Sequence, residues 1–396
     1  MGLFSLLRSL FALIGAAGIV LVVTVATEKL LPTSFFTEEI RYEIPAQKVV
    51  LAAERVEGEK QLEKKADTEF REIPTKTQTK SESVIVPAHS EKSQQPARNV
   101  PGGWEVSRIE NPYGIPPRSF ADINTEARAA LVNIFCNASG SLSPITASGV
   151  IVDGKGAVLT NAHVAQFILL EQSGKVNLRC ALRSGAPARD RWLLRVLYIP
   201  PEWVREHAHE ITDAHALGTG EHDWALLYIT DTADGSVLPA SFPHLPPDVR
   251  SAIGFTADSV LVASYPAGFL GGLATSMNLY PASAPTTIQE LMTFSSGSAD
   301  IFSIGGTITA QSGSSGGAVV NSWGYMIGLI TTMKEGETTN ERDLRALSLN
   351  YINTDLKAHT GSDLTSFISG NLAQKSAAFM ATEGNVLAEL LLEQLK

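Results

Sequence analysis

A serine framed by glycines is the residue with the clearest chemical potential in this chain. Ser315 lies in the stretch Gln311–Ala318, with sequence QSGSSGGA. Glycine has no Cβ, so a neighbouring hydroxyl can protrude and the main chain can approach a substrate closely. The N–H groups of Gly313 and Ser315 could then point together at a developing oxyanion. Taken alone, the stretch fits a nucleophilic serine with its oxyanion hole and a flexible Gly/Ser turn equally well.

Two residues earlier in the chain favour the catalytic interpretation. His163 lies at the end of the apolar segment 158–164, which follows a turn at 153–156. A histidine at the end of such a hairpin strand is a candidate general base. Asp223 directly precedes the apolar run 224–229, where its carboxylate could orient and stabilise the imidazole.

A Gly-x-Ser-x-Gly pattern also marks the nucleophile of α/β-hydrolases. In those enzymes the acid and the histidine follow the serine, and a helix comes directly after it. Here the only histidine after Ser315 is His359, and residues 318–330 are two strand-like runs around a turn. The order His163, Asp223, Ser315 instead fits the chymotrypsin arrangement.

Three segments resemble the signature segments of trypsin/chymotrypsin-like serine peptidases, with the bacterial HtrA-type branch the nearest. They are TNAHV around His163, DWALL from Asp223 and GSSGG around Ser315. The resemblance spans roughly residues 121–360. It implies an all-β fold of two β-barrels with the three residues in the cleft between them, as base, acid and acyl-forming nucleophile. One departure is Ala318, where HtrA-type chains usually carry proline.

The resemblance also implies where substrate specificity is set. Thr309 stands six residues before Ser315, where trypsin-like enzymes that select Lys or Arg carry an acid. Residues 329–332, including Thr331, would line the pocket wall. A neutral lining favours a small or apolar side chain before the cleaved bond. The expected substrates are proteins or peptides.

The N-terminal region predicts a membrane anchor. Residues 10–26 are almost wholly apolar, with Arg8 before them and Glu28 after them. Such a segment just spans a hydrocarbon core, and an uncleaved signal anchor over residues 1–28 is favoured over a cleaved signal peptide. The positive charge of Arg8 predicts a single-pass cell-membrane protein with a cytoplasmic N-terminus and the remainder outside.

The next expected unit is a linker over residues 29–118. Its charged, Ser/Thr/Gln-containing composition has few aromatic residues and cannot bury enough apolar surface to offset its ordering entropy. Residues 52–72 could form a transient helix or a short coiled coil. Proline becomes frequent after Pro87, which predicts a stiff tether.

A peptidase domain over residues 119–362 is expected to follow. It should begin with a capped helix at 122–130 and a strand at 131–136, and later contain a helical turn at 165–171 and a strand at 176–183. A helical tail, 363–396, is too short for the PDZ domain usual in HtrA-type proteases. It should pack on the domain or mediate self-association, so a homo-oligomer is possible.

Two cysteines, Cys136 and Cys180, fall in expected strands. In an oxidising compartment a disulfide between them would persist. As free thiols they would pack like small hydrophobic residues. The sequence favours the disulfide slightly and leaves both alternatives open.

Histidines cluster in one segment of the chain. Four of the eight lie between Pro200 and His222, namely His207, His209, His215 and His222. Residues two apart on a helix face different directions, and no H-E-x-x-H spacing occurs. The segment is therefore expected to be a solvated loop beside the cleft, and neither a metal ion nor a cofactor is expected.

Composition narrows the function further. The formal net charge of −10 argues against a nucleic-acid partner. Three hypotheses remain: a membrane-tethered serine endopeptidase facing the outside, a catalytically silent trypsin-fold binding module, and a tethered structural protein. The three motifs favour the first.

Overall fold

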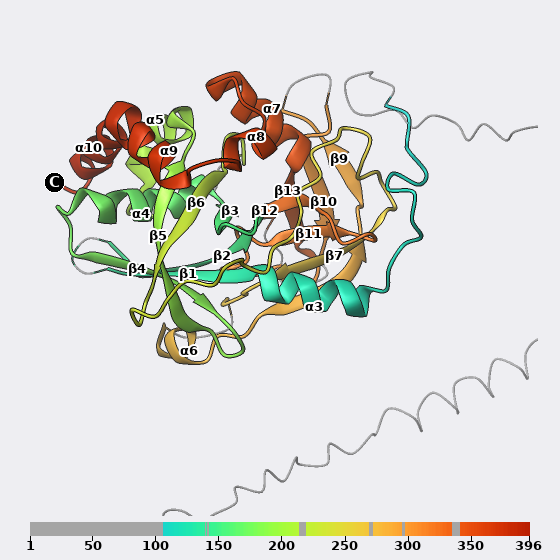
Figure 1. Cartoon of the computed structure of the whole chain (residues 1–396), viewed down its shortest axis with the longest axis horizontal. Helices are drawn as coiled ribbons and strands as arrows, with labels where there is room; N and C mark the ends of the chain where they lie inside the picture. The colour runs from blue at the N-terminus through green and yellow to red at the C-terminus, as the bar shows by residue number, and fades with distance from the viewer. Residues whose placement is uncertain are drawn as a thin grey trace, which may run out of the picture. The chain divides into compact units, whose positions relative to one another are not determined.

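The computed structural model describes most of the chain after residue 105 (Figure 1). The described residues are 106–138, 140, 142–213, 219–268, 272–294, 298–334 and 341–396, and they belong to one compact unit. The expected anchor at 1–28 and most of the expected linker lie outside these ranges. Every described helix is too short or too polar to traverse a bilayer.

Six strands close into an antiparallel β-barrel, with neighbour order β1-β2-β3-β6-β5-β4 and β4 pairing back to β1. The strands are β1 Leu131–Ala138, β2 Ile145–Ile151, β3 Ala157–Thr160, β4 Leu178–Ser184, β5 Arg189–Tyr198 and β6 Ala225–Thr232. Cys136 of β1 lies opposite Cys180 of β4 in register, and a disulfide joins them. The structure thus forms the disulfide that the sequence slightly favoured.

Seven strands form a second antiparallel sheet in the order β8-β7-β11-β12-β13-β10-β9. The strands are β7 Ser259–Ser264, β8 Ala282–Thr287, β9 Glu290–Met292, β10 Ile301–Gly305, β11 Ala318–Asn321, β12 Met326–Lys334 and β13 Asp343–Ser348. This sheet curves as a half-barrel and does not close by hydrogen bonding between β8 and β9. One closed barrel beside one half-barrel fits the expected chymotrypsin-like architecture.

Helices flank both sheets, and several of them differ from the sequence expectation. The helices are α3 Phe120–Ala130, α4 Ala162–Ser173, α5 Pro201–His207, α6 Gly272–Met277, α7 Leu349–Thr360, α8 Leu364–Ile368, α9 Leu372–Phe379 and α10 Asn385–Glu393, with a 3-10 turn Ala208–Glu210 and a π-helical turn Met380–Gly384. Helix α3 starts earlier than expected because the Ser119 side chain caps it by accepting from the Asp122 N–H. The expected helical turn is the full helix α4, which ends at Gly174 in the left-handed conformation.

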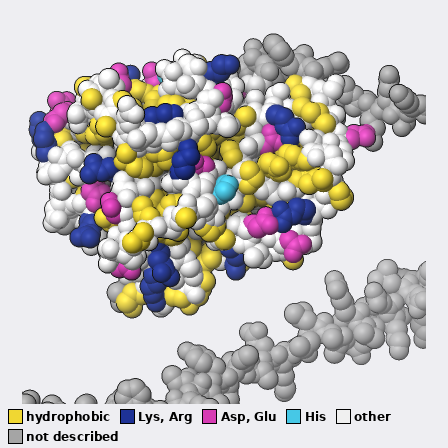
Figure 2. Space-filling view, viewed as in Figure 1, with side chains coloured by type: hydrophobic (Ala, Val, Ile, Leu, Met, Phe, Trp, Pro, Cys, Tyr) yellow, Lys and Arg dark blue, Asp and Glu magenta, His cyan; other side chains and the backbone are white. Residues whose placement is uncertain are grey.

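The surface carries mixed charge. On the face drawn in Figure 2, Lys and Arg side chains lie interspersed with Asp and Glu, with hydrophobic side chains between them. This face therefore has no extended patch of positive charge that would attract a polyanion.

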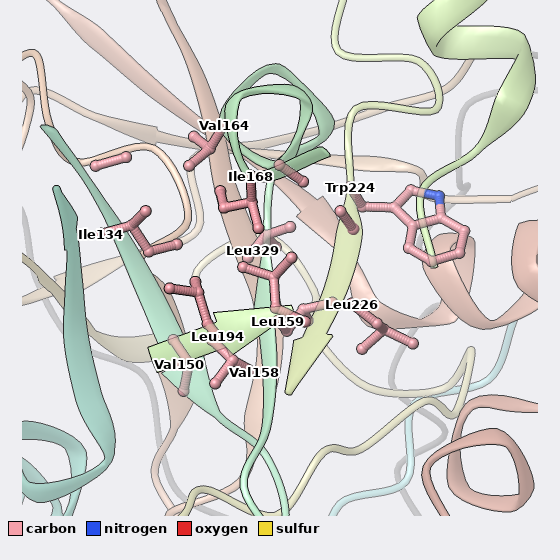
Figure 3. Packing of buried hydrophobic residues seen from close by; sticks show 14 of the residues in the cluster. Ile134, Val150, Val158, Leu159, Val164, Ile168, Leu194, Trp224, Leu226 and Leu329 are labelled. Carbon is pink, nitrogen blue, oxygen red and sulfur yellow. The ribbon is translucent and has the colours of Figure 1, made fainter. Parts of the chain in front are cut away.

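The core of the barrel positions the first part of the site. Figure 3 shows buried hydrophobic side chains of four barrel strands, among them Ile134, Val150, Val158 and Leu226, together with Ile168 of α4. Helix α4 is apolar nearly all round, with residues 164–170 buried, so it is enclosed rather than surface-bound. Its N-terminus is thereby fixed against the ends of β3 and β6.

The tail packs on the barrel, which is one of the two alternatives that the sequence left open. The other alternative, self-association, stays a prediction. Helix α9 lies against β5 and α10 against α4 and α5, as the red ribbon in Figure 1 shows. The buried Ser376 hydroxyl donates to the Val196 carbonyl at 2.6 Å, and Leu387 and Leu391 are buried. Its expected single helix is in fact a series of short helices.

The segment before α3 lies along the second sheet. The Tyr113 ring stacks on Tyr325 with centroids 4.2 Å apart, and the Arg118 N–H donates to the Ser322 carbonyl at 2.7 Å. Packing on the domain therefore begins before residue 119, within the final part of the expected linker.

Candidate active site

His163 and Asp223 are joined at two points. Asp223 stands directly before β6, and His163 lies in the first turn of α4. The His163 Nδ1 is 2.8 Å from Asp223 Oδ2, and the His163 backbone N–H donates to Asp223 Oδ1 at 3.0 Å. The Asp223 carbonyl accepts from Asn161 Nδ2 at 2.8 Å. Side chain and backbone of the acid are thus both fixed, and its carboxylate sets the plane of the imidazole.

In this pair the acid is buried and the base is partly exposed to solvent. The Asp223 side chain is 6% exposed and the His163 side chain 38%. Burial works against the charge on Asp223, but His163 and the hydrogen bonds to the carboxylate outweigh it and lower the pKa of Asp223. Burial likewise opposes a charged imidazole, and the Asp223 carboxylate outweighs it and raises the pKa of His163. This arrangement stabilises an imidazolium that forms when His163 accepts a proton.

The Ser315 loop depends on glycine for its shape. Gly313 has φ +89° and Gly316 φ +84°, in the left-handed region that residues with a Cβ rarely adopt. A Cβ on Gly316 would stand 1.9 Å from the Ser148 carbonyl oxygen. Among the residues that the structure describes, none accepts a hydrogen bond from the Gly313 or Ser315 N–H. Both groups are therefore available to an oxyanion.

Ser148 is a site residue that the sequence reasoning missed. Its hydroxyl, on β2 of the barrel, donates to the Gly313 carbonyl and accepts from the Tyr265 N–H, both at 2.8 Å. Its backbone N–H donates to the Ser315 carbonyl at 2.8 Å. A fully buried serine from the first barrel therefore fixes the loop of the second sheet. The only sequence signal is a Ser-Gly pair before an apolar run, which is too common to single out.

Thr331 links the predicted nucleophile to the predicted acid. Its hydroxyl donates to Asp223 Oδ2 at 2.7 Å, and its carbonyl accepts from the Ser315 hydroxyl at 3.3 Å. The structure thus gathers His163, Asp223 and Ser315 around one threonine of β12. The Thr331 side chain is directed at the acid, so a role for this residue in substrate binding stays a prediction.

Thr309 is fully buried behind the Ser315 loop. Its hydroxyl pairs with that of Thr307 at 2.6 Å, and its carbonyl accepts from the Ser314 hydroxyl. Both of these buried threonine side chains are uncharged. Direct contact between Thr309 and a substrate stays a prediction.

Residues 201–210 of the histidine-rich segment are helical and do not form the solvated loop that the sequence predicted, whereas His215 lies outside the described residues. Helix α5 begins at Pro201 and buries Trp203 and Val204, which turns the segment into a packed element. His207 bonds Glu210 within its own turn, with Nδ1 3.2 Å from Oε2. Within the described ranges no group of three or more His, Cys, Asp or Glu side chains is arranged to hold a metal ion.

Comparison with known families gives one match. Residues 147–329 match the family model described as the trypsin-like peptidase domain. The matched range contains all three residues gathered around Thr331 and also Ser148. No curated protein resembles the chain closely enough to count as a match.

Proposed function

Because residues 147–329 match the family model of the trypsin-like peptidase domain, we propose that the protein is a serine endopeptidase. His163 is its general base, Asp223 the acid that orients this base, and Ser315 the nucleophile. The relationship that carries the proposal is the convergence on Thr331 of the Asp223 carboxylate, bonded to His163, and the Ser315 hydroxyl.

The reaction follows from this geometry. Ser315 Oγ attacks the peptide carbonyl while His163 Nε2 takes its proton, and the carbonyl oxygen becomes an oxyanion between the N–H groups of Gly313 and Ser315. His163 returns the proton to the departing amine as the C–N bond breaks, leaving an ester on Ser315. Water then attacks the ester and gives a proton to His163, which passes this proton to Ser315 Oγ as the acid product leaves.

The proposed substrates are proteins or peptides with a small or apolar side chain before the cleaved bond. The support is the neutral pair Thr307 and Thr309 at the position where a charge would be needed to select a charged side chain. An enzyme usually selects a charged side chain with an opposite charge buried in its pocket, because a charged side chain left unpaired there is costly.

We also propose an extracytoplasmic location on the membrane. The support is the apolar segment 10–26 with Arg8 on its N-terminal side. The disulfide between Cys136 and Cys180 agrees with an oxidising compartment.

Hydrolysis of casein by the purified full chain, beside its Ser315→Ala variant, tests the proposed reaction. Cleavage should fall by about 10⁶-fold in the variant, because the nucleophile is lost. An active-site phosphonate should label the wild-type chain on Ser315 and leave the variant unlabelled. Sequencing the new N-termini would reveal the residue preferred before the cut.

The competing function is a catalytically silent binding module on the same fold. A folded wild-type chain that neither cleaves casein nor reacts with the phosphonate would favour this alternative. Equal cleavage by wild type and Ser315→Ala would instead point to a contaminating protease and remove the support for catalysis.

A further inference from the structure

A second buried carboxylate lies beside the turn that carries the catalytic acid. Asp355 of α7 is 8% exposed. Its Oδ2 accepts from His222 Nδ1 at 2.8 Å and from Trp224 Nε1 at 2.7 Å. These donors are the two residues that flank Asp223 in the chain. A single oxygen atom therefore holds both neighbours of the catalytic acid.

Contacts from α7 hold the backbone at His222. His222 has φ +56°, in the left-handed region that few non-glycine residues occupy, although histidine, asparagine and aspartate are found there more often than the others. Its N–H donates to the Tyr351 hydroxyl at 3.0 Å, so α7 holds both the main chain and the side chain of His222. Unusual dihedrals of this kind persist where the surroundings fix them, and they gather at functional sites.

The charges around His222 come from three elements. Asp355, Tyr351 and His359 face it from α7, Glu202 from α5, and Glu221 from its own turn. His359 Nδ1 lies 3.4 Å from Asp355 Oδ1, and its Nε2 lies 3.1 Å from Glu202 Oε2. The hydrogen bond to Asp355 raises the pKa of His222 against the opposing effect of burial. His222 and Asp355 thus form a second His–Asp pair next to the first.

We propose that Asp355 is a positioning residue for the catalytic acid. Through His222 and Trp224 it fixes the main chain at Asp223, so that Asp223 keeps both hydrogen bonds to His163. The inference rests on the proposed function for its catalytic meaning. The coupling from Asp355 to His163 can be tested whether or not the protein is a peptidase.

The coupling has a signature that ordinary destabilisation lacks. Asp223 raises the pKa of His163, so an acid that drifts from the imidazole lets that pKa fall. A displacement near 1 Å from a distant change can lower the rate about 100-fold. Because the interaction matters most when the imidazolium forms, kcat should fall and KM should change little.

The test replaces Asp355 in the full chain. Asp355→Leu removes the acceptor for both donors. Its matched control is Asp248→Leu, because Asp248 is equally buried at 7% exposure and accepts from Tyr113 and Arg250, neither of which touches the triad. Histidine NMR titration in the Ser315→Ala background measures the pKa of His163 without any activity, and His163→Ala identifies the signal.

The expected result is a lower pKa of His163 in Asp355→Leu than in wild type and in Asp248→Leu. In the otherwise wild-type chain, kcat on a peptide should fall by about 10- to 100-fold. An unchanged His163 titration in folded Asp355→Leu, with only a thermal shift like that of Asp248→Leu, would overturn the proposal. A wild-type chain without activity would refute the proposed function. The pKa of His163 in the variants would still test the coupling to Asp355.

Milder variants decide the question if Asp355→Leu does not fold. His222→Asn keeps a side-chain donor near the Nδ1 position and tolerates the left-handed backbone, whereas His222→Gly tolerates the backbone but has no donor. The pKa of His163 should be retained in His222→Asn and lowered in His222→Gly and Trp224→Phe. Equal titration in all three would show that the bonds to Asp355 do not reach the acid.

Discussion

The Thr331 hydroxyl donates to Asp223 Oδ2 at 2.7 Å, the same oxygen that faces His163 Nδ1. A residue of the second sheet therefore holds an acid of the first barrel. A hydrogen bond to a buried charge contributes about 1.5–3 kcal/mol. Thr331→Val should accordingly lower kcat/KM by about 10- to 100-fold, as steady-state kinetics on a peptide substrate would reveal.

Thr331→Ser is the control for this prediction, because it keeps the hydroxyl and removes only a methyl group. It should retain most of the activity. Equal losses in the Val and Ser variants would mean that packing at β12, and not the bond to Asp223, sets the rate.

Activity should rise with pH through the titration of His163. The base must be neutral to accept the Ser315 proton, and Asp223 raises the pKa of His163 above the ordinary value of about 6.5. The acidic limb of kcat/KM should therefore lie above that value. In Asp223→Asn it should move to lower pH while kcat falls by about 10⁴-fold; a limb that stays in place would contradict the assignment of the base.

The same pair links stability to pH with the opposite sign. Folding raises the pKa of His163 and lowers that of Asp223, so the pair contributes its full stability between about pH 4 and pH 6.5. That contribution is lost as pH rises through the folded pKa of His163. Denaturant titrations of wild type and His163→Ala should therefore differ most in that range and converge above the folded pKa.

Gly316 should tolerate no side chain. Its φ is +84°, and a Cβ would lie 1.9 Å from the Ser148 carbonyl oxygen of the barrel. Gly316→Ala should reduce the free energy of unfolding by at least about 3 kcal/mol, near the severe end for single substitutions. Urea denaturation provides the measurement. Gly174→Ala, at a helix end with open space around it, should cost much less.

The disulfide should contribute substantially to stability. Cys136 and Cys180 are 44 residues apart in the chain, and loop-closure entropy for such a span corresponds to about 4 kcal/mol. The double variant Cys136→Ala/Cys180→Ala should unfold at lower denaturant by a comparable amount. If reducing agent left the wild-type midpoint unchanged, the bond would not form in solution.

The three residues that the sequence singled out lie together in the structure, but the sequence did not predict the contacts that support them. His163, Asp223 and Ser315 stand out because each combines a reactive side chain with a flanking pattern of apolar or glycine residues. Such signals are local. The resemblance also led us to expect two barrels and a helical tail, whereas the structure has one closed barrel and a second sheet that remains open.

The supports could not be predicted because they are contacts between distant segments. Ser148 and Asp355 act on residues 165 and 131 positions away, through the Gly313 carbonyl and the Trp224 indole. Neither has a motif around it. The helix α5 was missed because its histidines and glutamates suggested solvent, whereas Trp203 and Val204 pack inward.

Under the proposed function, the bridge from Ser148 to the Ser315 loop makes activity depend on complete folding. The base and acid come from the barrel, the nucleophile comes from the second sheet, and the hydroxyl of a barrel serine orients the Gly313 carbonyl. Neither half alone holds a competent site. Under the proposed function, a nascent or partly unfolded copy would therefore be inactive until the barrel and the second sheet have packed together.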